Sequence, residues 1–115
     1  MTNYEKVREL HKKFNLPLDL GMLPESQAAF RLSLMEGEFN ELKKAIADND
    51  LLNILEEITD VLYSVYGTAA EYGFDVDEAF ARLHASNMSK DPPLTPGGKL
   101  VKGPNFKPKD MTDLA

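Results

Sequence analysis

Apolar side chains recur every three to four residues along four stretches of the chain, the spacing of helices that bury one face. The predicted helices cover about residues 3–14, 25–47, 50–72 and 75–89. The residues at their ends agree with these limits. Prolines and a glycine in "NLPLDLGMLPES" interrupt the chain after the first helix, and Gly73 suits a left-handed end to the third. Asp75 and Glu78 have the spacing of a capping box at the start of the fourth.

The composition changes after Lys90, where the chain reads "DPPLTPGGKLVKGPNFKPKD". Prolines exclude a long helix there, and "GGKLVKG" could supply one short extended segment or belong to a flexible tail. We therefore expect an all-α fold with a four-helix-bundle-like core over about residues 1–90 and an irregular Pro/Gly/Lys-rich tail over residues 91–115. The whole of residues 1–115 is expected to form a single domain.

The third predicted helix is apolar around more than half its circumference, wider than the stripe that one buried face requires. The arc consists of Leu51, Ile54, Leu55, Ile58, Val61, Leu62, Val65, Tyr66 and Ala69. Such a helix is typical of burial between layers of helices. We expect a homodimer or homotetramer, with a monomeric core as the alternative.

The composition excludes several kinds of chemistry. The formal net charge of −6 argues against a nucleic-acid polymer as partner, because phosphate binding requires a basic surface. The chain has no cysteine and two histidines, which excludes thiolate sites and makes a histidine-rich metal site improbable. The charged N-terminus and the absence of a long apolar run favour a cytoplasmic protein without a membrane partner. Catalysis would have to use carboxylates, amides, hydroxyls and lysines.

The second predicted helix carries two carboxylates near its apolar sector. Glu38 falls between Leu42 and Leu34 on a helical wheel, and Glu41 lies at the edge of the sector, three residues on. A carboxylate on a core-facing sector is unfavourable unless it is paired or bound to a cation. The alternative is that Glu38 lies at a helix margin and forms a salt bridge with Arg31.

The third predicted helix repeats the pattern with Glu57 and Asp60, again three residues apart. From residue 50 to residue 72 there is no Lys or Arg, although solvated helix faces commonly carry both signs of charge. The short "ADND" connector predicts that the two helices run antiparallel, which would bring the four carboxylates together. Such an all-oxygen site suits Mg²⁺, with Mn²⁺ as the alternative. A simple solvated polar stripe remains the other interpretation.

The fourth predicted helix ends with Asn87 and Lys90 on the same side as its apolar residues. An amide and a lysine near a carboxylate and metal cluster could bind phosphate oxygens. Alternatively, the two side chains interact with the last carbonyls of a fraying helix.

With these residues in view, the chain resembles the MazG-type, all-α nucleotide pyrophosphohydrolase superfamily. Relatives there include dimeric dUTPases, dCTP pyrophosphatases and phosphoribosyl-ATP pyrophosphohydrolase. The resemblance runs from about Gln27 to Lys109 and is carried by "EFNEL", "EEITDVLYSVYG", "EYGFDVDEAFARLHASNMSK" and "GGKLVKGPNFKPKD". The last two motifs are similar to those of a MazG-like subgroup with dUTPase-type activity.

The resemblance implies Mg²⁺-dependent hydrolysis of a nucleoside triphosphate to the monophosphate and pyrophosphate, by an assembly of identical chains. The positions that match the acidic metal-binding residues are Glu38, Glu41, Glu57 and Asp60. Glu38 is also the candidate for the base that activates water. Asn87 and Lys90 match positions near the nucleotide and its phosphates. The tail lysines Lys99 and Lys102 would help to hold phosphates.

The chain departs from the pattern at Gly37, since the relatives have an acidic pair where this chain has Gly37 and Glu38. Glu36 points to the opposite face of the helix and does not replace the missing carboxylate. Among substrates we expect a pyrimidine deoxynucleotide such as dUTP or dCTP, with a broad range of nucleoside triphosphates or phosphoribosyl-ATP as alternatives. A non-catalytic nucleotide-binding or dimerisation module, and a purely structural helix bundle, are the alternatives outside the enzymes.

Overall fold

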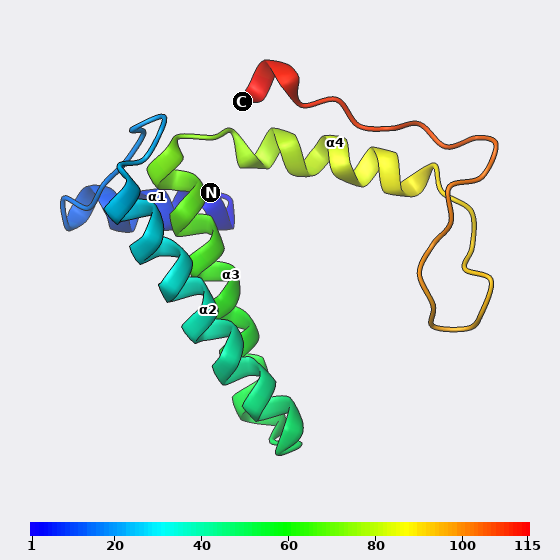
Figure 1. The fold of residues 1–115 in the computed structure, drawn as a ribbon, viewed down its shortest axis with the longest axis horizontal. Helices are drawn as coiled ribbons and strands as arrows, with labels where there is room; N and C mark the ends of the chain where they lie inside the picture. The colour runs from blue at the N-terminus through cyan, green and yellow to red at the C-terminus, as the bar shows by residue number, and fades with distance from the viewer. The chain divides into compact units, whose positions relative to one another are not determined.

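The computed structural model describes residues 1–115, and its regular structure is entirely helical (Figure 1). It contains α1 (Asn3–Lys13), α2 (Glu25–Ala47), α3 (Leu51–Tyr72), α4 (Val76–Met88) and the short 3₁₀-helix η1 (Thr112–Leu114). There is no β-strand, which confirms the predicted all-α fold with four helices. The chain divides into two compact units, Met1–Phe74 and Asp75–Ala115, and each is described by itself.

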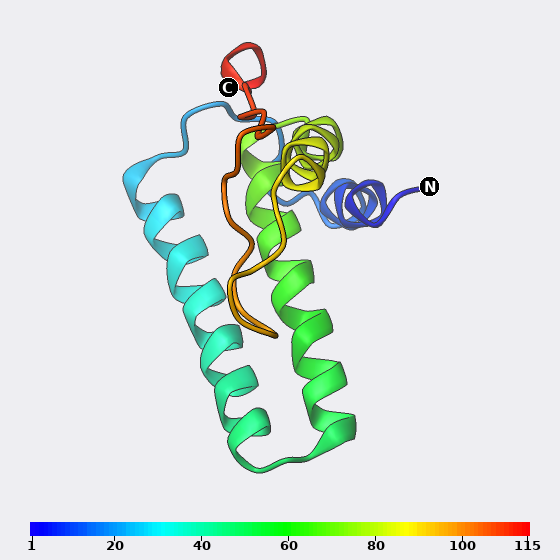
Figure 2. The ribbon, with the colours of Figure 1, turned by 90° about the vertical axis from the view of Figure 1, so that its right-hand side faces the viewer.

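In the first unit, α2 and α3 lie side by side and run in opposite directions, as the short connector predicted (Figure 2). The connector is tight because Asn49 adopts a left-handed conformation with φ 52°. Asp50 then caps α3, since its side chain accepts a hydrogen bond from the Asn53 N–H at 3.2 Å. Residues that are far apart in the sequence therefore face each other across the contact between α2 and α3.

The first helix packs against the C-terminal half of α3. It begins with a capping box that the sequence analysis missed, in which Thr2 and Glu5 bond reciprocally to each other's backbone. Tyr4 is buried, its ring centroid lies 5.7 Å from that of Tyr66, and its hydroxyl donates to the Phe74 carbonyl at 2.6 Å. These contacts fix α1 across α3.

The connector between α1 and α2 closes the end of α3. Backbone N–H groups of residues 19–21 donate to the carbonyls of residues 70–72 at 3.0, 2.8 and 3.2 Å, which satisfies acceptors that a helix end leaves free. Gly73 ends the helix with φ 82°. A Cβ at Gly73 would lie 2.9 Å from the Asp19 Cα, so both the conformation and the close approach require glycine.

A buried polar network joins α2 to α3 near this end. Arg31 and Glu71 are 7% and 1% exposed, and their side chains meet at 3.2 Å. Arg31 also donates to the Ser64 carbonyl at 2.8 Å and to the Thr68 hydroxyl at 3.1 Å, and Gln27 donates to Glu71 at 2.7 Å. A buried ion pair with these additional partners fixes the register of α2 against α3.

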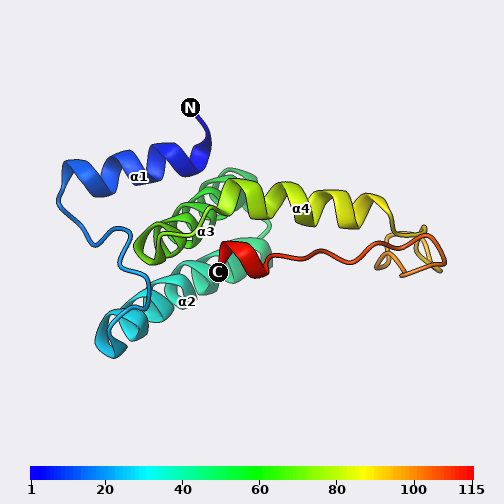
Figure 3. The same cartoon turned by 90° about the horizontal axis from the view of Figure 1, so that it is seen from above.

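The second unit consists of α4 and the C-terminal tail. Asp75 caps α4 by accepting from the Glu78 N–H at 3.1 Å. The tail turns back after Lys90 and runs along α4 toward its N-terminal end (Figures 1 and 3). In place of a strand, the tail has an isolated bridge in which Asp91 and Val101 exchange backbone hydrogen bonds at 2.9 and 3.2 Å.

Many apolar side chains on α2 and α3 are exposed in the single chain. Leu51 is 82% exposed, Leu55 63% and Val65 49%, and Phe30 and Phe39 of α2 are more than half exposed. The wide apolar arc of α3 is thus only partly covered. No helix combines the length and the apolar character that crossing a bilayer would require.

Candidate active site

Carboxylates from α2 and α3 converge along the contact between the two helices. Glu38, Glu41 and Glu57 each offer an oxygen, and these oxygens all lie within 4.8 Å of one another. They meet because Glu38 and Glu41 lie on successive turns of α2, and the antiparallel pairing brings Glu57 of α3 opposite them. We call Glu38, Glu41, Glu57 and Asp60 the acidic cluster.

Asp60 is not part of the tight group of three, although it belongs to the cluster electrostatically. Its negative charge contributes to raising the pKa of both Glu38 and Glu57. Asp60 and Glu38 also line a cavity of about 250 Å³ between α1, α2 and α3. The other walls of the cavity include Leu10, Leu34 and Tyr63. The cavity thus joins an acidic end to walls that are partly apolar and that also include His11, Arg31 and Ser64.

The charges of the cluster have no positive partner in the protein. None of the four carboxylates forms a salt bridge, and Arg31, the partner considered for Glu38, is committed to Glu71 instead. One oxygen of Glu57, Oε2, is buried and has no hydrogen-bond partner. A buried oxygen without a partner is uncommon in folded proteins, since it loses its bonds to water without replacement.

The electrostatics follow from this arrangement. Removal from water is the largest cause that raises the pKa of Glu38, followed by the charges of Glu41 and Asp60. Removal from water also raises the pKa of Glu57, followed by a hydrogen bond with Glu41 and the neighbouring charges. Two carboxyl groups can share a hydrogen bond only when one of them is protonated. The cluster therefore favours binding a positive species, either a proton or a metal ion.

The residues fit a divalent cation. Converging carboxylate oxygens on two helices, including one buried oxygen without a partner, match the hard oxygen ligands that Mg²⁺ and Mn²⁺ prefer. Thiolate and imidazole ligands are absent from the cluster. The donor set therefore favours Mg²⁺ or Mn²⁺ over metals that prefer nitrogen or sulfur.

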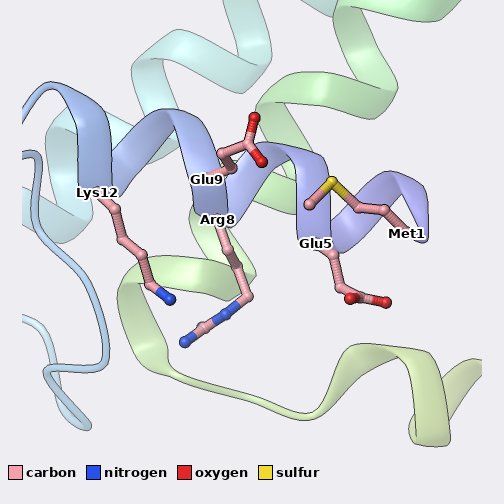
Figure 4. A pocket seen from close by; sticks show the side chains of 5 residues that line it. All are labelled: Met1, Glu5, Arg8, Glu9 and Lys12. Atoms are coloured by element: carbon pink, nitrogen blue, oxygen red, sulfur yellow. The ribbon is translucent and has the colours of Figure 1, made fainter.

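A second hollow, of about 390 Å³, lies on the surface of α1 and is lined by Met1, Glu5, Arg8, Glu9 and Lys12 (Figure 4). It is larger than the cavity beside the cluster. Its lining carries both signs of charge and comes from α1 and from Met1, two residues before the helix. Arg8 is already engaged by Asp19, with two hydrogen bonds of 2.8 and 2.7 Å. Chemistry, rather than size, therefore favours the acidic cluster as the site.

The predicted substrate-binding residues belong to the second unit. Asn87 and Lys90 are half-buried at the end of α4 and just beyond it. Lys99 and Lys102 are exposed in the tail, and neither forms a salt bridge. The ammonium of Lys102 lies 5.2 Å from the centroid of the Phe106 ring. Both tail lysines are therefore accessible to an anion.

Comparison with known proteins identifies the family. The phosphoribosyl-ATP pyrophosphohydrolase family matches residues 7–87, which include the acidic cluster and Asn87. The chain belongs to this family. The family consists of hydrolases that act on phosphoric anhydrides, so the predicted enzyme class and the resemblance to the all-α nucleotide pyrophosphohydrolase superfamily are confirmed. Enzymes of the family generally depend on a divalent metal, which agrees with the acidic cluster.

A relative of unassigned function is also similar to the chain. "Uncharacterized protein L479" of Acanthamoeba polyphaga mimivirus is 32% identical over 82 residues, which are 66% of this chain and 33% of that protein. The chain thus spans about a third of the length of the curated relative it matches.

Sequence reasoning did not find the network that supports the site. Arg31 was considered as a partner for Glu38, but its carboxylate partner is Glu71, on the other helix. One signal was present in the sequence, because Gly67 lies on the polar side of α3, three residues after Ser64 and four before Glu71. A Cβ there would lie 2.5 Å from Arg31 Nη2, so this glycine gives the guanidinium its room.

Proposed function

We propose that the chain is a Mg²⁺-dependent nucleoside triphosphate pyrophosphohydrolase, which converts a nucleoside triphosphate to the monophosphate and pyrophosphate. The observation that carries the proposal is the convergence of Glu38, Glu41 and Glu57 without a positive partner, on a chain of a pyrophosphohydrolase family. Mn²⁺ is the alternative metal. Phosphate groups repel a bare carboxylate cluster, so substrate and cluster require a cation between them.

In this proposal the four carboxylates divide the work. Glu41, Glu57 and Asp60 would hold the metal ion. Glu38 would either be a further ligand or lie next to the ion. The metal, when bound, neutralises phosphate charge and polarises the phosphoryl group that is attacked. Glu38 takes the proton from the attacking water, a role supported by the causes that raise its pKa above the ordinary value. Asn87, Lys90, Lys99 and Lys102 bind the nucleotide and its phosphates.

We propose a pyrimidine deoxynucleotide, such as dUTP or dCTP, as the substrate. The cavity of about 250 Å³ beside Glu38 and Asp60 supports this choice, because it adjoins the acidic cluster and offers Leu10, Leu34 and Tyr63 for a base to pack against. Its apolar walls suit a planar ring. Phosphoribosyl-ATP is the second candidate substrate, because the family that the chain matches is described by that activity.

The test is pyrophosphate release from a panel of nucleotides, including dUTP, dCTP, the common ribonucleoside triphosphates and phosphoribosyl-ATP. We expect release with Mg²⁺, with preference for a pyrimidine deoxynucleotide, and its loss with EDTA. Glu57→Gln should abolish release. Glu36→Gln is the matched control, since Glu36 is an exposed glutamate on α2 outside the cluster. Mg²⁺-dependent nucleotide binding without cleavage would instead identify a non-catalytic binding module.

We also propose that the enzyme is a homodimer or homotetramer. The support is the exposed apolar arc of α3, with Leu51, Leu55 and Val65, since a soluble monomer rarely exposes a contiguous apolar patch of this kind. Light scattering on the purified chain should give twice or four times the mass of 12.9 kDa, and Leu55→Asp should lower it. A monomeric mass for the unmodified chain would contradict the proposal.

A further inference from the structure

The C-terminal tail has little regular structure of its own. Over residues 91–115 the backbone forms one isolated bridge, a few turns and the three-residue helix η1. Most of its side chains are exposed. A segment with so few internal contacts keeps one conformation only where other residues hold it. The contacts between the tail and α4 therefore decide whether Lys99 and Lys102 occupy a defined place.

The strongest of these contacts centres on Arg82, in the middle of α4. Its Nη1 donates to Asp113 Oδ1 at 2.6 Å and its Nη2 donates to Asp113 Oδ2 at 3.1 Å, so the pair is bidentate. Nη1 also donates to the Asp110 carbonyl at 3.1 Å, and Nε donates to Glu78 at 3.1 Å. The hydrogen bonds raise the pKa of Arg82 and lower that of Asp113, so both stay charged at neutral pH. Planar bidentate pairs of this kind are the more effective surface ion pairs.

Two further contacts hold the tail closer to the end of α4. The Lys107 N–H donates to the Ser89 hydroxyl at 2.8 Å, and this hydroxyl donates to the Ser86 carbonyl at 2.6 Å. Asp91 is bridged to Val101 through the backbone. The two contacts are nested: the bridge closes residues 91–101, which contain Lys99, and the hydrogen bond between Lys107 and Ser89 encloses this loop together with Lys102. Each of these contacts is a single hydrogen bond or a single bridge, so none matches the multiple bonds of Arg82.

Arg82 contacts the part of the tail that runs back along α4. Its contacts with residues 110 and 113 bind the part of the tail that follows Lys107, where the chain runs back beside α4 (Figures 1 and 3). Without them, the last residues would be released and the Lys107–Ser89 hydrogen bond would lie next to a free end. Loss of the guanidinium is therefore expected to release the C-terminus and to weaken the neighbouring hydrogen bond between Lys107 and Ser89.

We propose that Arg82 is a positioning residue for substrate phosphates. By clamping the tail to α4 it holds Lys99 and Lys102 in place before substrate arrives, which removes part of the ordering cost of binding. The inference rests on the proposed function, since it takes these lysines as phosphate ligands. Neither lysine has a carboxylate partner that would compete with phosphate.

The test uses the full-length protein in four forms besides wild type. Arg82→Met removes the clamp, and Asp113→Asn removes its ion pair. Arg82→Asp with Asp113→Arg restores an opposite-charge pair, and Glu78→Gln is the matched control. Glu78 contacts the same guanidinium but lies on α4, so its loss leaves the contact with the tail intact. Hydrogen exchange over residues 91–115 measures tail order without nucleotide. KM and kcat for the best nucleotide, and the Kd of pyrophosphate with Mg²⁺, measure phosphate binding.

We expect Arg82→Met and Asp113→Asn to speed exchange in the tail and to raise KM and the pyrophosphate Kd about two- to fivefold, with kcat changed less. The reversed pair should recover much of the loss, and Glu78→Gln should resemble wild type. High salt should speed tail exchange in wild type and have less effect in Arg82→Met, because salt screens the clamp.

The outcomes separate the two proposals. Unchanged tail exchange in Arg82→Met overturns the clamp itself. Faster exchange with unchanged KM and pyrophosphate Kd overturns its role in phosphate binding. If no nucleotide is hydrolysed but pyrophosphate binding weakens in Arg82→Met and recovers in the reversed pair, the proposed function fails and the clamp stands. If wild type neither cleaves a nucleotide nor binds pyrophosphate, both the proposed function and the role in phosphate binding fail.

Discussion

Replacing Arg31 with methionine should destabilise the fold far more than losing any exposed ion pair. The guanidinium contacts Glu71, the Ser64 carbonyl and the Thr68 hydroxyl, at 3.2, 2.8 and 3.1 Å. Arg31→Met leaves Glu71 as a charge that is 1% exposed, with the side-chain amide of Gln27 as its remaining polar partner. Breaking a buried pair in this way costs about 3 to 5 kcal/mol.

The cost is a large share of the stability of a chain this size, which is about 5 to 15 kcal/mol. It corresponds to a fall in Tm of about 10 to 25 °C for 115 residues. Arg8→Met is the matched control, because it removes an arginine whose partner, Asp19, is half exposed. Its cost should not exceed about 1 kcal/mol.

A double-mutant cycle measured by urea unfolding provides the sharper test. Glu71→Met alone leaves the Arg31 charge buried and should cost about as much as Arg31→Met. The double variant Arg31→Met with Glu71→Met replaces both charges by apolar side chains and should lie within about 2 kcal/mol of wild type. The reasoning is refuted if the losses of unfolding free energy in the two single variants simply add in the double variant. It is also refuted if Arg31→Met lowers the free energy of unfolding by less than about 1 kcal/mol, where at least about 3 kcal/mol is expected.

Further predictions concern the acidic cluster and the glycines. In EDTA, the stability of wild type relative to Glu57→Gln should fall as pH rises above 4.5, the ordinary pKa, because the raised pKa means that the folded state binds more protons than the unfolded state. The difference should level off above the raised pKa, and a difference that does not vary with pH would contradict this. Gly67→Ala should cost about 1 to 3 kcal/mol in urea unfolding, since its Cβ would lie 2.5 Å from Arg31 Nη2 and 3.2 Å from His11 Nε2. Gly37→Ala, with no atom within 4 Å of the added Cβ, should instead stabilise α2 by about 0.5 to 1 kcal/mol. Equal effects of the two substitutions on the free energy of unfolding would contradict the proposed difference in packing at the two glycines.

Helix limits were predictable because their signals are local. The second predicted helix, residues 25–47, coincides with α2. Gly73 ends α3 in the left-handed conformation expected of it, and Asp75 caps α4. Each of these features depends on a few neighbouring residues, whose preferences act whatever the rest of the chain does.

The partners of charged residues were not predictable in the same way. Arg31 and Glu38 lie two turns apart on one helix, so the sequence alone offers them as a pair. In the structure Arg31 instead forms a salt bridge with Glu71, 40 positions further along the chain. The antiparallel packing of α2 on α3 brings these two buried side chains together. The contact between Arg82 and Asp113 likewise joins residues far apart in the sequence, although it lies at the surface. A helical wheel shows which face a side chain occupies, and only the packing shows what lies opposite.

The pairing of Arg31 with Glu71 also explains why the acidic cluster favours a cation from solution. Arg31 is the buried basic residue of the contact between α2 and α3, and its charge is neutralised by the ion pair with Glu71. No other arginine or lysine forms a salt bridge with a carboxylate of that contact. Glu38, Glu41 and Glu57 are thereby left close together with unbalanced charge, held in place by helices that the Arg31 network fixes. The same ion pair that stabilises the fold thus keeps the cluster available to a metal ion.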